Sequence, residues 1–287
     1  MEDRIKKFVV LIDAGTYTAA AKQLHTSQPA LTTAVQKLER EIKSPLLVRG
    51  SRTLQMTREG EVVYTHGQQL LREEQNLQAE LGALAGQKQP FRLGCIDSIA
   101  LTLVQAKLLP ILENDSEVSL VVQSSTVLLE ELKQGRLDMA IIVEQPQRLP
   151  DYSERFLGDE KFALVCRKSE IEQYATEAKA GTLRNFLAYN HESTTFRMLE
   201  GQLQQNRIAI EPSLYSTNPS VLAGLAQQGK GITALPLAFA GQHIGGKLAE
   251  IDLRKPLYRP IYAFWHKDRK LPGSIEDFLD ATEIQVV

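Results

Sequence analysis

Polar side chains recur along one face of residues 24–41, LHTSQPALTTAVQKLERE, and their chemical types suit nucleic-acid recognition. The apolar residues that run from Leu31 to Ile42 through Val35 and Leu38 are spaced by four, three and four, which places them on one helical face. The other face then carries hydroxyls, amides and a guanidinium, which hydrogen-bond to base edges and phosphates in a DNA groove. These outward residues are Gln28, Thr32, Thr33, Gln36 and Arg40. From the pattern alone, a solvated polar surface with no partner is an equal alternative.

The elements around this helix must position that face. Pro29 falls in the first helical turn, where its missing N–H costs nothing, and Thr26 or Ser27 can cap the exposed amides. Two further helices are expected upstream, over residues 4–13 and 18–24, with Gly15 as a C-terminal cap of the first. A helix, a tight turn and a second helix that exposes polar groups follow the helix-turn-helix plan.

A short hairpin is predicted beyond the third helix. PLLVRGSRTLQMT alternates in polarity and turns at Gly50 and Ser51, with Arg49 and Arg52 near the tip. A basic hairpin beside a recognition helix makes a winged arrangement, with the arginines placed for phosphates or the minor groove. Residues 1–60 carry ten Lys and Arg against six Asp and Glu, a net of +4, in a chain whose total is -2. A basic front on an acidic body favours a polyanionic partner for the front.

One long helix is predicted from about Arg58 to Gly86, with Thr57 as its cap. Apolar residues recur every seven positions along it, and such a repeat is typical of helix-to-helix pairing. The alternative is a single helix packed on its own body. The repeat consists of Val63, Leu70, Leu77 and Leu84, with Leu81 adding a second position.

The remainder, residues 90–287, alternates strand and helix and predicts a parallel α/β sheet. Strands are expected over residues 91–97, 118–124, 137–143, 161–167, 211–216, 231–236 and 259–266. Helices are expected over residues 101–114, 126–135, 182–188, 194–207, 218–229 and 273–281.

Hydroxyl and amide side chains follow several of these strands, where helix N-termini offer unpaired amides to a ligand. Each of them can equally serve only as a helix cap. They favour a small polar or anionic ligand, although Asp97 and Glu144 argue against simple anion selection. The candidates are Ser98, Ser125, Thr126, Thr195, Thr217 and Asn218.

The stretch AAAKQLHTSQPALTTAVQKLEREIKSPLLVRGSRTLQMTREG resembles the DNA-binding signature of LysR-type transcriptional regulators. That signature reads A-A-x-x-L-x-x-S-Q-P-A-x-S/T-x-x-I/V-x-x-L-E, followed by L-F/L-x-R and L-T-x-x-G. The departures are local: Ile42, Lys43 and Ser44 stand where the family usually has Leu-Gly, Leu47 replaces the usual phenylalanine, and Met56 replaces a leucine. In the body, LLEELKQGRLDMAII and LAGLAQQGKGITALP resemble motifs of the family's effector domain, so the resemblance covers almost the whole chain.

The resemblance implies an α+β composite: a winged helix-turn-helix, a dimerising linker helix and a two-lobed effector domain with the fold of periplasmic type-2 binding proteins. The limits would be residues 1–57, 58–89 and 90–287, with lobe I at about 90–158 and 262–287 and lobe II at about 159–261. It places Ser98, Ser125 and Thr195 where members contact effector. It implies a sequence-specific regulator that binds a dyad operator as a homodimer or homotetramer. The DNA-binding residues would be Ser27, Gln28, Pro29, Thr32, Thr33, Gln36, Arg40, Arg49 and Arg52.

Other classes of function find less support. No motif of a hydrolase, metalloprotease or nucleotide-binding loop occurs, the five histidines lack ligand spacing, and no metal or cofactor is expected. No membrane span or signal peptide is recognisable, so a cytoplasmic protein is expected. Cys95 and Cys166 are interpreted as buried apolar side chains, with a redox switch as the alternative. The alternative function is a small-molecule-binding protein or enzyme with an N-terminal oligomerisation module.

Overall fold

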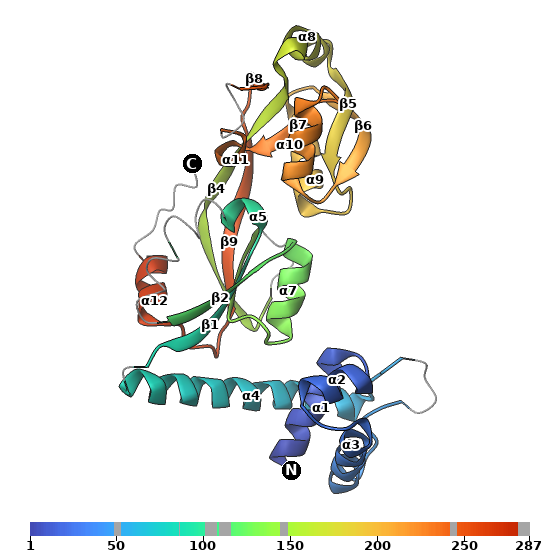
Figure 1. Ribbon diagram of the computed structural model, residues 1–287, viewed down its shortest axis with the longest axis vertical. Coiled ribbons are helices and arrows are strands. Elements are labelled where there is room, and N and C mark those ends of the chain that lie inside the picture. Colours follow the sequence, from blue (N-terminus) through green and yellow to red (C-terminus); the bar gives the residue numbers. More distant parts are fainter. Residues whose placement is uncertain are drawn as a thin grey trace. The chain divides into compact units, whose positions relative to one another are not determined.

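The structure is a computed structural model that describes residues 1–48, 53–85, 87–100, 108, 116–143, 149–241 and 246–280. The chain divides into two compact units. Unit 1 comprises residues 1–87 with the short segments 133–136 and 268–270, and unit 2 comprises the remaining residues from 88 onward. The helices and strands are labelled in Figure 1.

Unit 1 contains four helices in its described part: α1 (Glu2–Ala14), α2 (Tyr17–Gln23), α3 (Gln28–Ile42) and α4 (Arg58–Leu84). The three predicted N-terminal helices are therefore present, and α1 ends at Gly15, which adopts the left-handed φ of 68° that glycine tolerates. The inward face of α3 is the predicted one, because Leu31, Val35 and Leu38 are buried and Ile42 packs against them. The buried core is completed by Phe8, Leu11, Ala20, Ala21 and Leu46.

A pair of antiparallel segments follows α3. Leu47 bridges Met56, and the Val48 N–H donates to the Gln55 carbonyl at 2.9 Å. These contacts form the base of the predicted hairpin. Its tip, with Arg49, Gly50, Ser51 and Arg52, lies outside the described residues.

Helix α4 begins as predicted, because the Thr57 hydroxyl accepts a hydrogen bond from the Gly60 N–H at 3.0 Å. Its predicted end at Gly86 lies outside the described residues. Val63 packs against the core of unit 1, whereas the later members of the seven-residue repeat are exposed. The exposed members, which we call the leucine stripe, are Leu70, Leu77, Leu81 and Leu84.

Unit 2 is built on a seven-stranded sheet in the order β2-β1-β3-β9-β4-β7, with β8 also paired to β4 (Figure 1). Only β1, β2 and β3 pair in parallel; β9 runs antiparallel to β3 and β4. The expectation of a parallel sheet is thus wrong for four of its six strand pairings, because β9 runs antiparallel to β3 and β4, and β7 and β8 run antiparallel to β4. The strands are β1 (Gln89–Cys95), β2 (Ser116–Val122), β3 (Met139–Val143), β4 (Tyr152–Arg167), β7 (Thr233–Pro236), β8 (Leu248–Ile251) and β9 (Leu257–His266).

A second, two-stranded sheet joins β5 (Thr182–Tyr189) in parallel to β6 (Ala209–Ser216). The helix predicted over residues 182–188 is therefore wrong. Its apolar run is short enough to suit either element, and pairing with β6 decides for a strand. Helix α8 (Ile171–Ala180), which precedes β5, is not among the predicted elements.

Helices connect most of these strands. Of the helix predicted over residues 101–114, the structure describes only Leu108, which is buried. Within the described residues, no helix combines the length and apolar character that a membrane crossing needs. The described helices of unit 2 are α5 (Asp97–Ile99), α7 (Ser125–Lys133), η2 (Lys168–Glu170), α8, α9 (Thr194–Gln205), α10 (Pro219–Gln227), α11 (Leu237–Ala240) and α12 (Gly273–Asp280).

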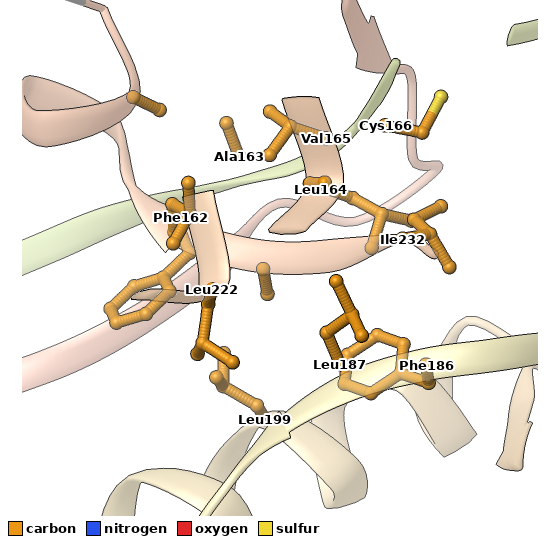
Figure 2. Close-up of a cluster of buried hydrophobic side chains, with 14 of the residues drawn as sticks. Phe162, Ala163, Leu164, Val165, Cys166, Phe186, Leu187, Leu199, Leu222 and Ile232 are labelled. Atoms are coloured by element: carbon orange, nitrogen blue, oxygen red, sulfur yellow. The ribbon is translucent and has the colours of Figure 1, made fainter. Parts of the chain in front are cut away.

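Unit 2 has two hydrophobic cores. The first core gathers side chains of β1, β3, α7 and α12. The second core, part of which is shown in Figure 2, gathers side chains of β5, α9, α10 and β7. The strands β4 and β9 contribute to both, with Leu157 and Ile261 in the first core and Phe162 and Leu257 in the second. The two cores are therefore tied together by one continuous pair of strands.

Candidate functional sites

The polar face of α3 is built from the start of the helix. Ser27 is the N-cap, and its hydroxyl accepts a hydrogen bond from the Ala30 N–H at 3.3 Å. Pro29 lies in the first turn, as predicted, so the helix is not interrupted. Gln28 is exposed, and its side-chain oxygen accepts from the Thr18 hydroxyl of α2 at 3.4 Å. The turn between α2 and α3 thus fixes the start of the polar face.

The two threonines of this face bond back to their own helix. The Thr32 hydroxyl donates to the Gln28 carbonyl at 3.0 Å, and the Thr33 hydroxyl donates to the Pro29 carbonyl at 2.9 Å. A hydroxyl has one proton, so each side chain offers the outside an acceptor oxygen and a methyl group. This arrangement suits contacts to base donors or to the thymine methyl.

Gln36 and Arg40 continue the exposed face toward the end of α3. They line a surface hollow together with Lys43 and with Thr57 at the start of α4. Lys43 ends the helix in the left-handed conformation, with a φ of 61°. The remaining predicted DNA-binding residues, Arg49 and Arg52, lie outside the described residues.

Unit 2 contains a polar cavity of about 430 Å³. The starts of three helices meet there, since Ser125 opens α7, Thr194 opens α9 and Asn218 caps α10. Five of the six predicted effector residues line it. These five are Ser125, Thr126, Thr195, Thr217 and Asn218.

The sixth, Ser98, is buried and reaches the cavity through Arg259, which the sequence analysis missed. The Arg259 guanidinium donates to the Ser98 hydroxyl at 2.9 Å and to the Thr195 hydroxyl at 2.8 Å. It also pairs with the Glu160 carboxylate, which is directly opposite it in the β4–β9 ladder. The one available signal was Arg259 itself, a single Arg within the otherwise largely apolar stretch LYRPIYAFW.

Two further groups of the cavity lining were not predicted as ligand contacts. Asp97 follows β1, and burial, the largest cause, raises the pKa of its carboxyl. Tyr189 ends β5, and its buried hydroxyl has no hydrogen-bond partner among the described residues. Burial also raises the Tyr189 pKa strongly, so the phenol stays protonated.

Both cysteines are buried thiols, one in each core of unit 2. Burial raises the pKa of Cys95 to about 12 and that of Cys166 to about 11. Because the thiolate is the reactive form, this burial supports their interpretation as small apolar side chains. The residues that the structure describes contain no group of three or more acidic, histidine or cysteine side chains that could hold a metal.

Comparisons with known families identify both units. A family model of the LysR substrate binding domain matches residues 85–284. A model of the bacterial regulatory helix-turn-helix protein of the lysR family matches residues 3–61. The fold and these matches define a helix-turn-helix transcriptional regulator with an effector-binding domain. The chain belongs to the LysR family.

Individual relatives agree with this membership. The transcriptional activator AaeR of Escherichia coli strain K12 is 25% identical over 281 residues, 95% of this chain and 90% of its own. The nitrogen assimilation regulatory protein nac of Klebsiella aerogenes is 28% identical over 240 residues, 81% of this chain and 77% of its own. The family consists of transcriptional regulators rather than enzymes.

Solved structures share the fold. A full-length OxyR of Pseudomonas aeruginosa has a TM-score of 0.71 at 20% identity and covers 98% of this chain and 94% of its own. LysG of Corynebacterium glutamicum, solved with bound effector Arg, has a TM-score of 0.62 at 17% identity and coverages of 97% and 96%. DarR of Vibrio fischeri, solved in complex with DNA, has a TM-score of 0.55 at 18% identity and coverages of 99% for both chains.

Proposed function

We propose that this regulator binds a dyad operator through α3 and the hairpin, and that a small polar effector in the unit 2 cavity modulates this binding. The observation that carries the proposal is the exposed polar face of α3, held over a buried apolar face on a capped helix. Family membership and the DNA complex of a structural relative support it.

The proposed division of labour follows side-chain chemistry. Gln28, Thr32, Thr33 and Gln36 contact base edges, whereas Arg40 contacts phosphate together with Arg49 and Arg52 of the hairpin. Ser27 and Pro29 position the helix and place its first amides near the backbone. The corresponding domain limits are residues 1–57 for DNA binding, 58–89 for the linker and 90–287 for effector binding, with the lobes divided near residues 158 and 261.

Dimerisation is assigned to the leucine stripe of α4. Exposure of four leucines on one helix to water is unfavourable unless a partner covers them. In a dimer, the two recognition helices would read the two half-sites of the operator. Further association of dimers would give a homotetramer. A bacterial operator places the protein in the cytoplasm, and the cavity serves as a sensor rather than an active site.

The test of the DNA-binding assignment is the double variant Thr32→Ala, Gln36→Ala. We expect it to lose about 2–6 kcal/mol of specific binding energy in a gel-shift or anisotropy titration on the protein's own promoter. Non-specific binding, measured on a scrambled duplex, should change little because phosphate contacts supply it.

The chain offers a matched control. Thr65→Ala, Gln69→Ala makes the same two changes at the same spacing on α4, and Thr65 also bonds back to its helix, through the Glu61 carbonyl at 2.9 Å. This control should keep wild-type affinity. If the α3 variant binds operator and scrambled DNA with an unchanged ratio, the assignment of α3 is wrong.

A further inference from the structure

The two charged residues in the lining of the polar cavity differ in whether they have an ion-pair partner. Its described lining contains two charged residues, Arg259 and Asp97. Arg259 is neutralised by Glu160, and both of these side chains are buried. Asp97 forms no ion pair with any described residue; its Oδ1 accepts a hydrogen bond from the Ser98 N–H at 3.0 Å. The cavity therefore presents one carboxylate that lacks a cation.

The same cavity presents unused donors from helix starts. The Ser193 hydroxyl accepts from the Phe196 N–H at 3.1 Å, so the earlier amides of α9, at Thr194 and Thr195, remain without a described partner. The start of α7, at Ser125, adds a second set of first-turn amides. Amides at helix starts carry partial positive charge and favour an anionic group.

The Tyr189 side chain belongs to the same cavity lining. It is more than nine-tenths buried, lines the cavity, and is close enough to Asp97 and Arg259 for their charges to act on it. A buried hydroxyl without a partner is uncommon in native proteins, so its position points to a bound ligand as the partner. A phenol can accept one hydrogen bond and donate another at the same time.

We propose that the cavity binds a small zwitterion of the α-amino-acid class. The ligand ammonium pairs with Asp97, the ligand carboxylate binds the amides at the starts of α7 and α9, and the Tyr189 hydroxyl bonds to both groups. A simple carboxylate would face the Asp97 charge, and a simple cation would leave the helix amides unpaired. This inference rests on the proposed function, since it names the class of effector for that site.

The experiment uses the full-length protein and the proteinogenic L-amino acids as probes in a thermal-shift screen. Each amino acid that raises Tm is compared with its 2-hydroxy acid, which lacks the ammonium, and with its methyl ester, which lacks the carboxylate. We expect at least one amino acid to raise Tm while both analogues fail, because a ligand stabilises the fold it binds. No shift with any amino acid, or an equal shift with the 2-hydroxy acid, overturns the proposal.

Calorimetric titration of the same amino acid then tests the residues. Asp97→Asn should raise Kd about tenfold or more, and the exposed control Asp252→Asn should leave Kd unchanged. Tyr189→Phe should raise Kd about fivefold while the unliganded protein stays as stable as wild type, because the removed hydroxyl bonds to no described protein group. If Asp97→Asn fails to fold, the Kd of Tyr189→Phe alone tests the proposed ligand site. Unchanged Kd in Tyr189→Phe and in any folded Asp97→Asn overturns the site.

Measurements of operator binding distinguish a failure of the zwitterion proposal from a failure of the proposed effector control of DNA binding. An amino acid that binds the cavity but leaves operator affinity unchanged overturns the effector role and upholds the zwitterion site. A 2-hydroxy acid that changes operator affinity where amino acids do not upholds effector control and overturns the zwitterion.

Discussion

Arg259 has four described hydrogen-bond contacts and lies over the Phe162 ring at 4.9 Å. Arg259→Met would leave the Glu160 carboxylate buried without its cation, which is the costly way to break a buried pair. We expect the free energy of unfolding to fall by about 3–5 kcal/mol in urea titrations.

Two variants control this prediction. Arg254→Met changes an exposed arginine of the preceding turn and should alter stability by less than about 0.5 kcal/mol. The double variant Arg259→Met, Glu160→Gln should be more stable than Arg259→Met alone, since it removes the stranded charge. A double variant as unstable as the single one would assign the loss to packing instead.

Asp97 makes the stability of the unliganded protein depend on pH. Burial raises its pKa in the folded state above the unfolded value, so the folded protein holds the proton more tightly. Stability from this group is present at low pH and is lost as the pH rises through the raised pKa. Asp97→Asn should therefore gain in relative stability as the pH rises from about 4 through the raised pKa, as measured by unfolding at several pH values. A constant difference between the variant and wild type across that range would contradict the prediction.

At the scale of elements, α4 carries the most direct prediction. Leu77 is exposed in the single chain, and the proposed dimer buries it. Leu77→Glu places a charge in that interface and should raise the dimer dissociation constant about a hundredfold or more, as measured by analytical ultracentrifugation. Gln78→Glu adds the same charge one residue further along and should leave the dimer intact. Equal effects of the two changes would locate the dimer contact elsewhere.

Elements were predictable from sequence where local signals agreed. The capping serine, the first-turn proline and the apolar spacing together define α3, and each acts within a few residues. The run TLRNFLAY offered no such agreement, because its strand character depends on a partner some 27 residues away in β6. Pairing direction in the large sheet was likewise out of reach, since β9 meets β3 only after most of unit 2 has intervened.

Across the whole molecule, the candidate sites divide in the same way. The α3 face follows from helical periodicity, and the serines and threonines of the cavity follow from their places at helix starts. Glu160 and Tyr189 had no local signature, and Arg259 had only its charge within an apolar stretch, because the roles of all three arise from register between distant strands and from burial. Sequence reasoning thus located the cavity but missed Arg259 in its lining and the partner Glu160.

The strands shared by the two cores determine how cooperatively unit 2 unfolds. One hydrogen-bonded ladder runs from Tyr152 opposite His266 to Phe162 opposite Leu257. Because β4 and β9 contribute side chains to both cores, unfolding one core also removes packing from the other. Local opening of one lobe should therefore require nearly the whole energy of global unfolding. Cys95 and Cys166 report this directly, because each thiol is hidden in a different core.

In thiol-labelling at low denaturant, both cysteines should become reactive with the same opening free energy, within about 0.5 kcal/mol. Labelling of one thiol about tenfold more readily than the other would show that the lobes open separately. With a common opening energy, neither thiol reacts unless the sensor domain as a whole has unfolded, which gives the two cysteines a use as paired reporters of cooperativity.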